Sequence, residues 1–347
     1  LRNIASPEPV PLLIKALRDR DLNVSSAAAE NLGKIADPRA VPELLAALDR
    51  SNIPFCYTIL EALGRIGEPV PLDAVMSLAD ESLLKKPLID CLGAIGDVKS
   101  VPLLIKGLGE KSRHVRAAAA VSLLKIRDGL PEDRAFEVVD TPLRSLAGTP
   151  FARELIKSMG CEKNLSEQMV KVLGLLGDPA AALLLLEGCR DDRLRGACLH
   201  SFRQIGAEGW NAVIDYYPAA DEERKSYIIY ICGELGVVES AGILRAAMQS
   251  SCHMLRRVAA VAAGNIGEGK IIADIEALLD DDELDVRVGA IESLARLADV
   301  DRTYVATIAG KLAAASGSDK RSSAVTLYAA LKMTAGLERR LRDEDAN

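Results

Sequence analysis

The chain has 347 residues, of which 49% are hydrophobic but only 3% aromatic, and its formal net charge is −7. Sequence-independent binding to a nucleic-acid backbone needs a basic face, so we expect no nucleic acid partner. No apolar run approaches the roughly 20 residues of a membrane span, and no signal peptide is visible. We therefore expect no membrane partner and a cytoplasmic location.

The cysteines indicate a reducing compartment. Their number is odd and no CxxC motif occurs, which argues against a disulfide framework. They are scattered over the chain at Cys56, Cys91, Cys161, Cys189, Cys198, Cys232 and Cys252. Because the chain begins at Leu1, already within repeat-like sequence, we expect it to be part of a longer protein.

The segment 101–126 predicts a pair of helices joined by a tight turn. Pro102 stands where a first helical position is expected. Apolar residues then recur every three or four positions up to Leu108. After a turn at 110–112, a second apolar stripe passes through Leu123, which serves below as the reference position of the second helix.

This unit is repeated along the chain with a period of about 30 residues. The reference position is occupied successively by Leu32, Leu63, Leu92, Leu123, Leu173, Phe202, Cys232, Ala263 and Leu294. The next residue is glycine at Gly33, Gly64, Gly93, Gly174, Gly233 and Gly264. Glycine inside a helix costs roughly 1 kcal/mol relative to alanine, so its recurrence indicates close packing.

Helix pairs are predicted throughout the chain. The first are 7–19 with 21–36, 38–49 with 52–66, 69–79 with 81–95, and 99–108 with 112–127. The next are 149–159 with 165–176, 179–189 with 191–205, 208–217 with 221–235, 238–249 with 252–266, and 270–279 with 283–297. A degenerate tenth repeat at about 301–335 suits a terminal cap or a domain junction, and 337–347 is a charged tail.

One interval between reference positions, from Leu123 to Leu173, is longer by about 20 residues and indicates an insertion at about 128–148. The segment 132–140 is a candidate extra helix. The insertion is either a binding element on one face of the repeat array or a helix that lengthens the fifth unit, and the sequence leaves both readings open.

The repeats resemble the HEAT-like repeats of phycobilin lyases. The resemblance is carried by LGKIADPRAVPELLAAL (32–48), LGRIGEPVPLDAVMSL (63–78), LGAIGDVKSVPLLIKGL (92–108), HVRAAAAVSLLKI (114–126), LGLLGDPAAALLLL (173–186) and DVRVGAIESLARL (285–297). It implies an all-α, right-handed α-solenoid of about ten HEAT-like helix pairs, which we expect to form one domain over 1–347, because each unit of such an array packs on its neighbours.

A basic residue recurs seven positions before the reference position, at Lys85, Arg116, Arg195, Lys225, Arg256 and Arg287. Acidic residues recur in the turns at Asp37, Glu68, Asp97, Asp178 and Glu268. An anionic ligand is one reading, but the resemblance implies structural ties between repeats. We therefore expect Arg116 near Asp97 and Arg287 near Glu268, as pairs that add modestly to stability.

Partner-binding candidates lie two and six positions before the reference position, because 100° per residue turns these side chains away from the core. The resemblance implies that second helices line a concave surface. In the second half of the chain these positions include His200, Tyr230 and Arg257. In the first half they include Glu30, Tyr57, Glu61, Lys86 and Asp90, which predicts an acidic surface there.

Six of the twelve aromatic residues fall between Phe202 and Tyr230. Aromatic residues are enriched at interaction hot spots. Phe202 stands at the reference position and is expected in the core, and Tyr227 is expected to be partly buried. The candidates for partner contact are Trp210, Tyr216, Tyr217 and Tyr230. The alternative is that they fill gaps between helices.

Catalytic chemistry is poorly supported by the sequence. The three histidines, His114, His200 and His253, sit in different repeats, and none is followed by glutamate. A HEAT-like deoxyhypusine hydroxylase holds its irons with His-Glu pairs, which this chain lacks. No phosphate-binding or nucleophile motif is present. We expect no catalytic residues, no metal and no cofactor.

The sequence therefore predicts a non-enzymatic scaffold or docking module that binds another protein, or a neighbouring domain of the same chain, on the concave surface. It would form part of a longer bacterial regulatory protein. The first alternative is a phycobilin lyase-like subunit that handles a tetrapyrrole chromophore. The second is a HEAT-like DNA-lesion glycosylase, which would need a basic cleft and is disfavoured by Glu30, Glu61 and Asp90.

Overall fold

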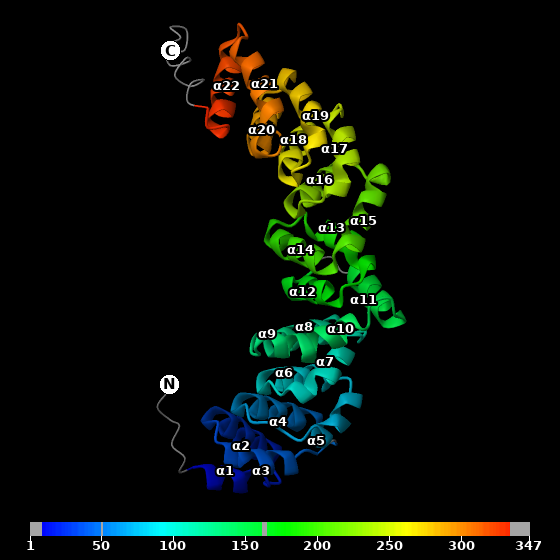
Figure 1. The fold of residues 1–347 in the computed structure, drawn as a ribbon. Coiled ribbons are helices and arrows are strands. Elements are labelled where there is room, and N and C mark those ends of the chain that lie inside the picture. The colour runs from blue at the N-terminus through cyan, green and yellow to red at the C-terminus, as the bar shows by residue number, and fades with distance from the viewer. Residues whose placement is uncertain (1–8, 50, 162–164, 334–347) are drawn as a thin grey trace. The chain divides into compact units, whose positions relative to one another are not determined.

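The computed structural model describes residues 9–49, 51–161 and 165–333, and every regular element in these ranges is helical. The protein is an all-α solenoid, as the sequence predicts. Its contacts divide the chain into two units, 1–178 and 179–347. Each unit is a stack of helix pairs, visible as successive layers in Figure 1.

The described residues of unit 1 form five pairs in which a shorter first helix generally precedes a longer second helix. They are α1 (Val10–Ala16) with α2 (Leu22–Ile35), α3 (Val41–Ala46) with α4 (Ile53–Ile66), α5 (Leu72–Met76) with α6 (Lys85–Ile95), α7 (Val101–Leu108) with α8 (Arg113–Asp128), and α11 (Pro150–Gly160) with α12 (Glu167–Leu176). An additional helical segment, described below, stands between α8 and α11.

Unit 2 repeats the same alternation. Its pairs are α13 (Ala182–Gly188) with α14 (Asp192–Ile205), α15 (Ala207–Tyr216) with α16 (Glu222–Leu235), α17 (Ala241–Met248) with α18 (His253–Ile266), α19 (Ile272–Ala277) with α20 (Leu284–Arg296), and α21 (Arg302–Ala313) with α22 (Ser318–Ala330). The last pair corresponds to the degenerate repeat.

The predicted ranges agree well for second helices and less well for first helices. The range 52–66 corresponds to α4 and 191–205 to α14, each within one residue. The range 69–79 holds only the short α5 and part of a 3₁₀ turn, Ser77–Asp80. The start of the first predicted helix at residue 7 and the tail 337–347 lie outside the described residues.

Second helices begin and end with specific capping groups. Asp21, Asn52, Asp191 and Asp221 each accept a hydrogen bond from a backbone N–H in the first turn of the following helix. Most of these helices end at a glycine with positive φ, such as Gly67 at 78° and Gly96 at 77°. At the end of α2, Ala36 occupies the same left-handed conformation with a φ of 58°, which is unfavourable for a residue with a Cβ.

The glycine after the reference position allows neighbouring second helices to touch. A Cβ added at Gly93 of α6 would lie 2.1 Å from the Oγ and 2.9 Å from the Cα of Ser122 in α8. At Gly233 of α16 it would lie 2.7 Å from the Cβ of Ala262 in α18. The close packing expected from the sequence is therefore confirmed.

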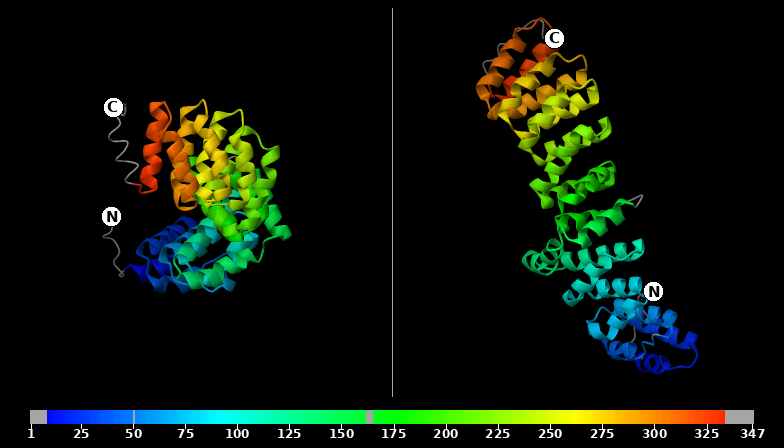
Figure 2. Two further views of the ribbon diagram at one scale, coloured as in Figure 1. Left: turned by 45° about the horizontal axis from the view of Figure 1, so that its top comes forward. Right: turned by 90° about the vertical axis from the view of Figure 1, so that its right-hand side faces the viewer.

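Three pairs carry a larger residue at this position, namely Leu124 in α8, Arg203 in α14 and Ala295 in α20. At these places the following second helices, α12, α16 and α22, make less extensive contact with their predecessors than α4, α6, α18 and α20 make with theirs. Figure 2 shows the parallel arrangement of the layers within each unit. Within each unit, tight and loose stacking thus follow the presence and absence of the glycine.

The insertion forms an almost continuous helical segment: α9 (Glu132–Ala135), a π-helical turn (Phe136–Asp140) and α10 (Thr141–Arg144). It packs against α8 and α12. Arg127 of α8 donates two hydrogen bonds to the buried carboxylate of Asp140, at 2.8 and 2.9 Å. Of the two readings left open by the sequence, the structure favours an extra helix that extends the fifth unit.

The recurrent basic residues have a structural role, but with different partners from those expected. Arg116 donates to the carbonyl oxygens of Glu110 and Lys111, at 2.8 and 2.9 Å, and Arg287 donates to those of Asp281 and Asp282. The pairs Arg116–Asp97 and Arg287–Glu268 do not form. The carboxylates of Asp97 and Glu268 instead accept from the backbone of Lys99 and Lys270, respectively. Each basic residue lies near the start of its second helix, whereas Asp97 and Glu268 lie beyond the end of the preceding second helix.

Two basic residues also reach the turn of the next pair. Lys85 contacts Glu110 at 2.7 Å, and Arg256 forms a bidentate pair with Asp281 at 2.7 and 2.9 Å. The side chains of Arg256 and Asp281 are only 17% and 8% exposed. Arg256 also donates to the carbonyl oxygens of Ser250 and Ser251, so it ties α18 both to its own turn and to the following one.

Candidate functional site

The predicted partner-binding residues of unit 1 lie exposed on its second helices. Glu30, Glu61 and Asp90 each form an ion pair one helical turn away, with Lys34 at 2.6 Å, Arg65 at 2.8 Å and Lys86 at 2.6 Å. The hydrogen bond from Lys34 lowers the pKa of Glu30. Tyr57 lies one turn before Glu61 and is 51% exposed.

These pairs change the electrostatic character expected for this surface. Because each acid is accompanied by a base, the second helices α2, α4 and α6 carry rows of alternating charge, and the prediction of an acidic surface is wrong. The sequence contained the signal, since the bases stand four residues after Glu30 and Glu61 and four before Asp90. Tyr57 remains as an exposed aromatic side chain among paired charges.

Unit 2 brings three residues of the sequence analysis together between α14 and α16. The guanidinium carbon of Arg195 lies 5.8 Å from the ring centroid of Tyr227 and 5.7 Å from that of Tyr230. Arg195 also donates to the carbonyl oxygen of Cys189 at 3.2 Å and pairs with Asp192. We call Arg195, Tyr227 and Tyr230 the arginine–tyrosine cluster.

The geometry of this cluster limits the freedom of both rings. A cation within about 6 Å of a tyrosine face is attracted by the ring quadrupole, by about 0.5–1 kcal/mol at exposed sites. All three side chains remain partly accessible. Burial raises the pKa of Tyr230, so its hydroxyl stays protonated near neutral pH and can donate a hydrogen bond. Near the other end of α14, Arg203 stands at the glycine position and donates to the carbonyl oxygen of Glu234 in α16 at 3.2 Å.

The other aromatic candidates are arranged differently. Tyr217 is only 7% exposed, in the 3₁₀ turn Tyr217–Ala219 that follows α15, with the ammonium of Lys225 5.6 Å from its ring centroid. Burial raises its pKa. The prediction that Tyr217 contacts a partner is therefore wrong, because the chain turns inward at this point and uses the ring to fill the core.

Trp210 and Tyr216 are half-buried on α15, the first helix of its pair, and so do not share a helix with Tyr230. The indole Nε1 of Trp210 is enclosed and has no hydrogen-bond partner among the described residues. Trp210 is thus mainly a packing residue with one unsatisfied polar atom. Gap filling, the alternative reading of the aromatic group, describes Tyr217 and Trp210 best.

His200 on α14 and Arg257 on α18 are both exposed. Their positions relative to the reference residue match those of Tyr230 and Tyr57, so they lie on the outward side of second helices. The helix between them, α16, packs against both α14 and α18. His200, Tyr230 and Arg257 therefore mark three successive second helices on one face, which we call the second-helix face of unit 2.

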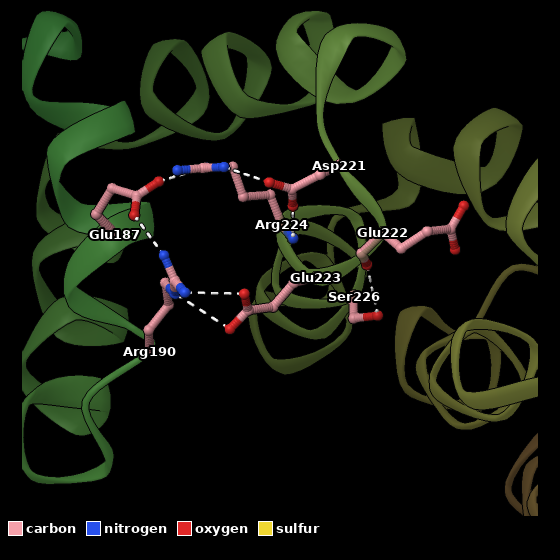
Figure 3. Close-up of polar contacts among 7 residues, drawn as sticks. All are labelled: Glu187, Arg190, Asp221, Glu222, Glu223, Arg224 and Ser226. Atoms are coloured by element: carbon pink, nitrogen blue, oxygen red, sulfur yellow. Dashed lines mark hydrogen bonds and ion pairs between the residues drawn. The ribbon is translucent and has the colours of Figure 1, made fainter. Parts of the chain in front are cut away.

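A network of charged side chains fixes α13 to the start of α16 (Figure 3). Glu187 of α13 accepts from Arg224 and, at 3.1 Å, from Arg190. Arg190 also holds the carboxylate of Glu223 with two hydrogen bonds, at 2.8 and 3.2 Å. Asp221 caps α16 and pairs with Arg224.

The network was missed by the sequence analysis because its members are far apart in the chain and do not follow the repeat. Because its acids and bases alternate in space, each charged side chain has an oppositely charged neighbour within the network. We interpret it as the support that holds α16, and with it Tyr227 and Tyr230, in register with α13.

Membrane insertion and metal binding each require a distinct arrangement of residues. No helix within residues 9–49, 51–161 and 165–333 is both long and apolar enough to cross a bilayer. In the same ranges, no group of three histidine, cysteine, aspartate or glutamate side chains gathers as a metal ion would require.

Comparison with known proteins supports the fold class. Residues 10–86 match the family model described as HEAT repeats. A crystal structure of importin beta has a TM-score of 0.54 at 14% identity, with 94% of this chain and 54% of that chain covered. The present chain is therefore an α-solenoid protein. Within it, residues 10–86 are similar to HEAT repeats.

Two other solved structures are more distant. An engineered protein gives a TM-score of 0.41 at 16% identity, over 93% of this chain and 98% of that one. Human deoxyhypusine hydroxylase gives 0.29 at 18% identity, over 84% and 96%. TM-scores of this size support no argument about the present chain. No curated protein sequence matches it significantly.

Proposed function

We propose that the protein is a non-enzymatic scaffold that binds a protein partner through the second-helix face of unit 2. The observation that carries the proposal is the arginine–tyrosine cluster, in which Arg195 holds Tyr227 and Tyr230 in place while leaving them partly accessible. Tyrosine and arginine are enriched among the residues that dominate binding energy.

The surroundings of the cluster suit a protein surface. Exposed His200 and Arg257 lie on the two neighbouring second helices, so a partner that covers Tyr230 also meets polar groups at the edge. Such an apolar centre with a polar rim is the usual organisation of protein interfaces. Because the rings are already ordered, a partner loses little side-chain entropy on binding them.

Finer aspects of the function are further proposals. We propose that the chain is a docking module of a longer bacterial regulatory protein in the cytoplasm. Its partner would be another protein or a neighbouring domain, and neither nucleic acid nor a membrane. The specific relation to the phycobilin-lyase type of repeat stays a prediction from the motifs quoted above. No observation on the structure favours the tetrapyrrole alternative.

The test begins with capture of a partner from a lysate of the source organism on the immobilised chain. The purified partner is then titrated into the chain and measured by calorimetry. Tyr230→Ala is expected to weaken binding by about tenfold or more, equivalent to about 1.4 kcal/mol. Tyr230→Phe should retain most of the affinity, because the ring that contacts Arg195 is preserved.

Two control variants make the result specific. Tyr57→Ala removes a more exposed tyrosine from unit 1 and should not change the affinity. Trp210→Ala should lower thermal stability more than affinity, since its indole is packed. A partner lost with Tyr57→Ala but retained by Tyr230→Ala would refute the proposed site, and turnover of a captured small molecule would refute the non-enzymatic scaffold.

A further inference from the structure

A groove opens in unit 2 between α20 and α22, on helices that do not belong to the arginine–tyrosine cluster. It has a volume of about 980 Å³ and is walled by the first half of α20, the end of α21 and the first turns of α22. On the other side of α20, Gly264 lets α18 approach closely. On this side Ala295 stands at the glycine position, and α22 makes less extensive contact.

The floor of the groove is an apolar stripe on α20. Leu284 and Val288 are 58% and 47% exposed, and Ile291 continues the stripe deeper in the groove at 8%. These three residues have the spacing i, i+4, i+7 and span about 10 Å along one face of the helix. Leu279 and Leu312 close the inner side.

The apolar stripe is absent from the two preceding second helices of unit 2. The corresponding residues of α18 are His253, Arg257 and Ala260, and those of α16 are Glu222, Ser226 and Ile229. Two large exposed aliphatic side chains side by side, where neighbouring repeats carry charged or polar residues, indicate a contact surface rather than a packing requirement of the fold.

The rim of the groove is acidic. Asp280, Asp281, Glu292 and Asp319 line it together with two basic residues, Arg287 and Lys320. Both bases are engaged, since Lys320 pairs with Asp280 and Arg287 donates to the carbonyl oxygens of Asp281 and Asp282. Two of the acids are paired as well, Asp280 with Lys320 and the 8% exposed Asp281 with Arg256. The exposed carboxylates of Glu292 and Asp319 therefore outweigh the charge of Arg287 at the edge.

We propose that this groove binds a short amphipathic helix of a protein partner that presents a stripe of aliphatic residues flanked by lysine or arginine. An i, i+4, i+7 stripe is the complement of the anchors that a helix lays into an apolar groove. The acidic rim selects basic flanks by charge complementarity and disfavours acidic ones. This groove does not include the arginine–tyrosine cluster, so the two proposals are tested by substitutions at different residues.

The experiment uses the full chain and a defined probe. The probe is a helical peptide of leucine and lysine, about 15 residues long, with leucines at the spacing of one helix face. The control peptide has the same composition in scrambled order, and hence the same charge. Fluorescence anisotropy is expected to show one-to-one binding of the patterned peptide, about tenfold tighter than that of the scrambled one.

Variants locate the binding. Val288→Asp and Leu284→Ser should each weaken binding of the patterned peptide by about tenfold. Both side chains are exposed, so the substitutions should leave the fold unchanged. Val121→Asp, at an equally exposed valine of α8 in unit 1, should have no effect. Glu292→Lys should weaken binding less, and its effect should disappear at high salt.

Several outcomes would overturn the proposal. Equal binding of the two peptides would show that only net charge is recognised. Binding that survives Val288→Asp would place the peptide elsewhere. Self-association of the chain that is abolished by Val288→Asp in sedimentation velocity would show that the groove is occupied by a second copy instead.

Discussion

The two sides of α20 show how one position in the repeat controls the space between neighbouring helices. Toward α18 the contact is so close that a Cβ at Gly264 would lie 2.7 Å from the Cα of Ser293. Toward α22, where Ala295 takes the place of the glycine, the contact is less extensive, and a groove of about 980 Å³ lies beside the earlier part of α20.

The same repeat can therefore produce closed places, where neighbouring second helices touch, and open places, where they make less extensive contact. Closed places need a glycine on one helix and a small residue on the next, as in Gly93 with Ser122 and Gly233 with Ala262. Open places follow when the glycine is lost, and they are where other side chains gather: the insertion at α8–α12, the arginine–tyrosine cluster at α14–α16 and the acidic groove at α20–α22.

The largest expected effect comes from breaking a closed place. Gly93→Ala puts a methyl group where the side chain and backbone of Ser122 already lie, so either α6 or α8 has to shift. Overpacking of this kind costs about 1–3 kcal/mol, and we expect the upper part of that range. Urea unfolding followed by circular dichroism measures it through the transition midpoint.

The control for this variant is Gly196→Ala in α14. A Cβ at Gly196 meets no atom within 4 Å, so the substitution should stabilise the helix by about 0.5–1 kcal/mol. If Gly93→Ala were as harmless as Gly196→Ala, close approach would not be the reason for the recurrent glycine.

The second effect concerns the ion pair that joins α18 to the turn before α20. Arg256→Met keeps the apolar stem but leaves the carboxylate of Asp281 largely buried without its bidentate partner. Loss of a charged partner in such a position costs about 1–3 kcal/mol. The neighbouring and exposed Arg257 supplies the control, since Arg257→Met should change stability by no more than about 0.5 kcal/mol.

The effect of Arg256→Met should depend on pH. Hydrogen bonding to Arg256 lowers the pKa of Asp281 in the folded state, so the pair adds stability that is fully present above the unfolded pKa of about 3.9. That stability is lost as pH falls through the folded pKa. The difference between wild type and Arg256→Met should therefore be largest near pH 7 and shrink below about pH 4. A difference that stays constant to pH 3 would contradict this account.

A smaller effect is expected from the hydrogen bond that accompanies close stacking. The hydroxyl of Ser293 donates to the carbonyl oxygen of Ala260 in α18 at 2.6 Å, and both groups are buried. Ser293→Ala should cost about 1 kcal/mol. Ser323→Ala in α22 removes only a bond within one helix, from Ser323 to the carbonyl oxygen of Asp319, and should be nearly neutral. Equal losses in the two variants would argue against a special role for the bond between helices.

The periodicity was sufficient to predict the fold class, the second helices and the reason for the recurrent glycines. These features are local or repeat at a fixed interval, so the pattern of apolar residues reveals them. The prediction of an extra helix in the insertion was also confirmed, because residues 132–144 form a helical segment.

The site was predicted less completely, since its geometry depends on contacts between repeats. Arg195 and Tyr230 were both noted, but their juxtaposition depends on how α14 and α16 pack. Tyr217 was misjudged because its burial depends on the turn that follows α15. The groove left two signals that could have been used, the missing glycine at Ala295 and the aliphatic residues Leu284 and Val288 at positions that are polar on the preceding helices.

The smallest effect tests the backbone at the ends of second helices. Ala36 adopts a left-handed conformation with a φ of 58° at a position where Gly67 and Gly96 adopt 78° and 77°. Relief of the contact between its Cβ and the backbone favours glycine, while the greater freedom of glycine in the unfolded chain opposes it. We expect Ala36→Gly to stabilise the protein by about 0.5–1 kcal/mol.

The reciprocal substitution provides the matched control for Ala36→Gly. Gly67→Ala introduces a Cβ that meets no atom within 4 Å, so only the backbone conformation is changed, and a loss of similar size is expected. Opposite shifts of the urea midpoint in the two variants would show that α2 ends under strain that the other second helices avoid with glycine. A gain from both substitutions, or from neither, would mean that Ala36 is held by its surroundings rather than by the intrinsic preference of the residue.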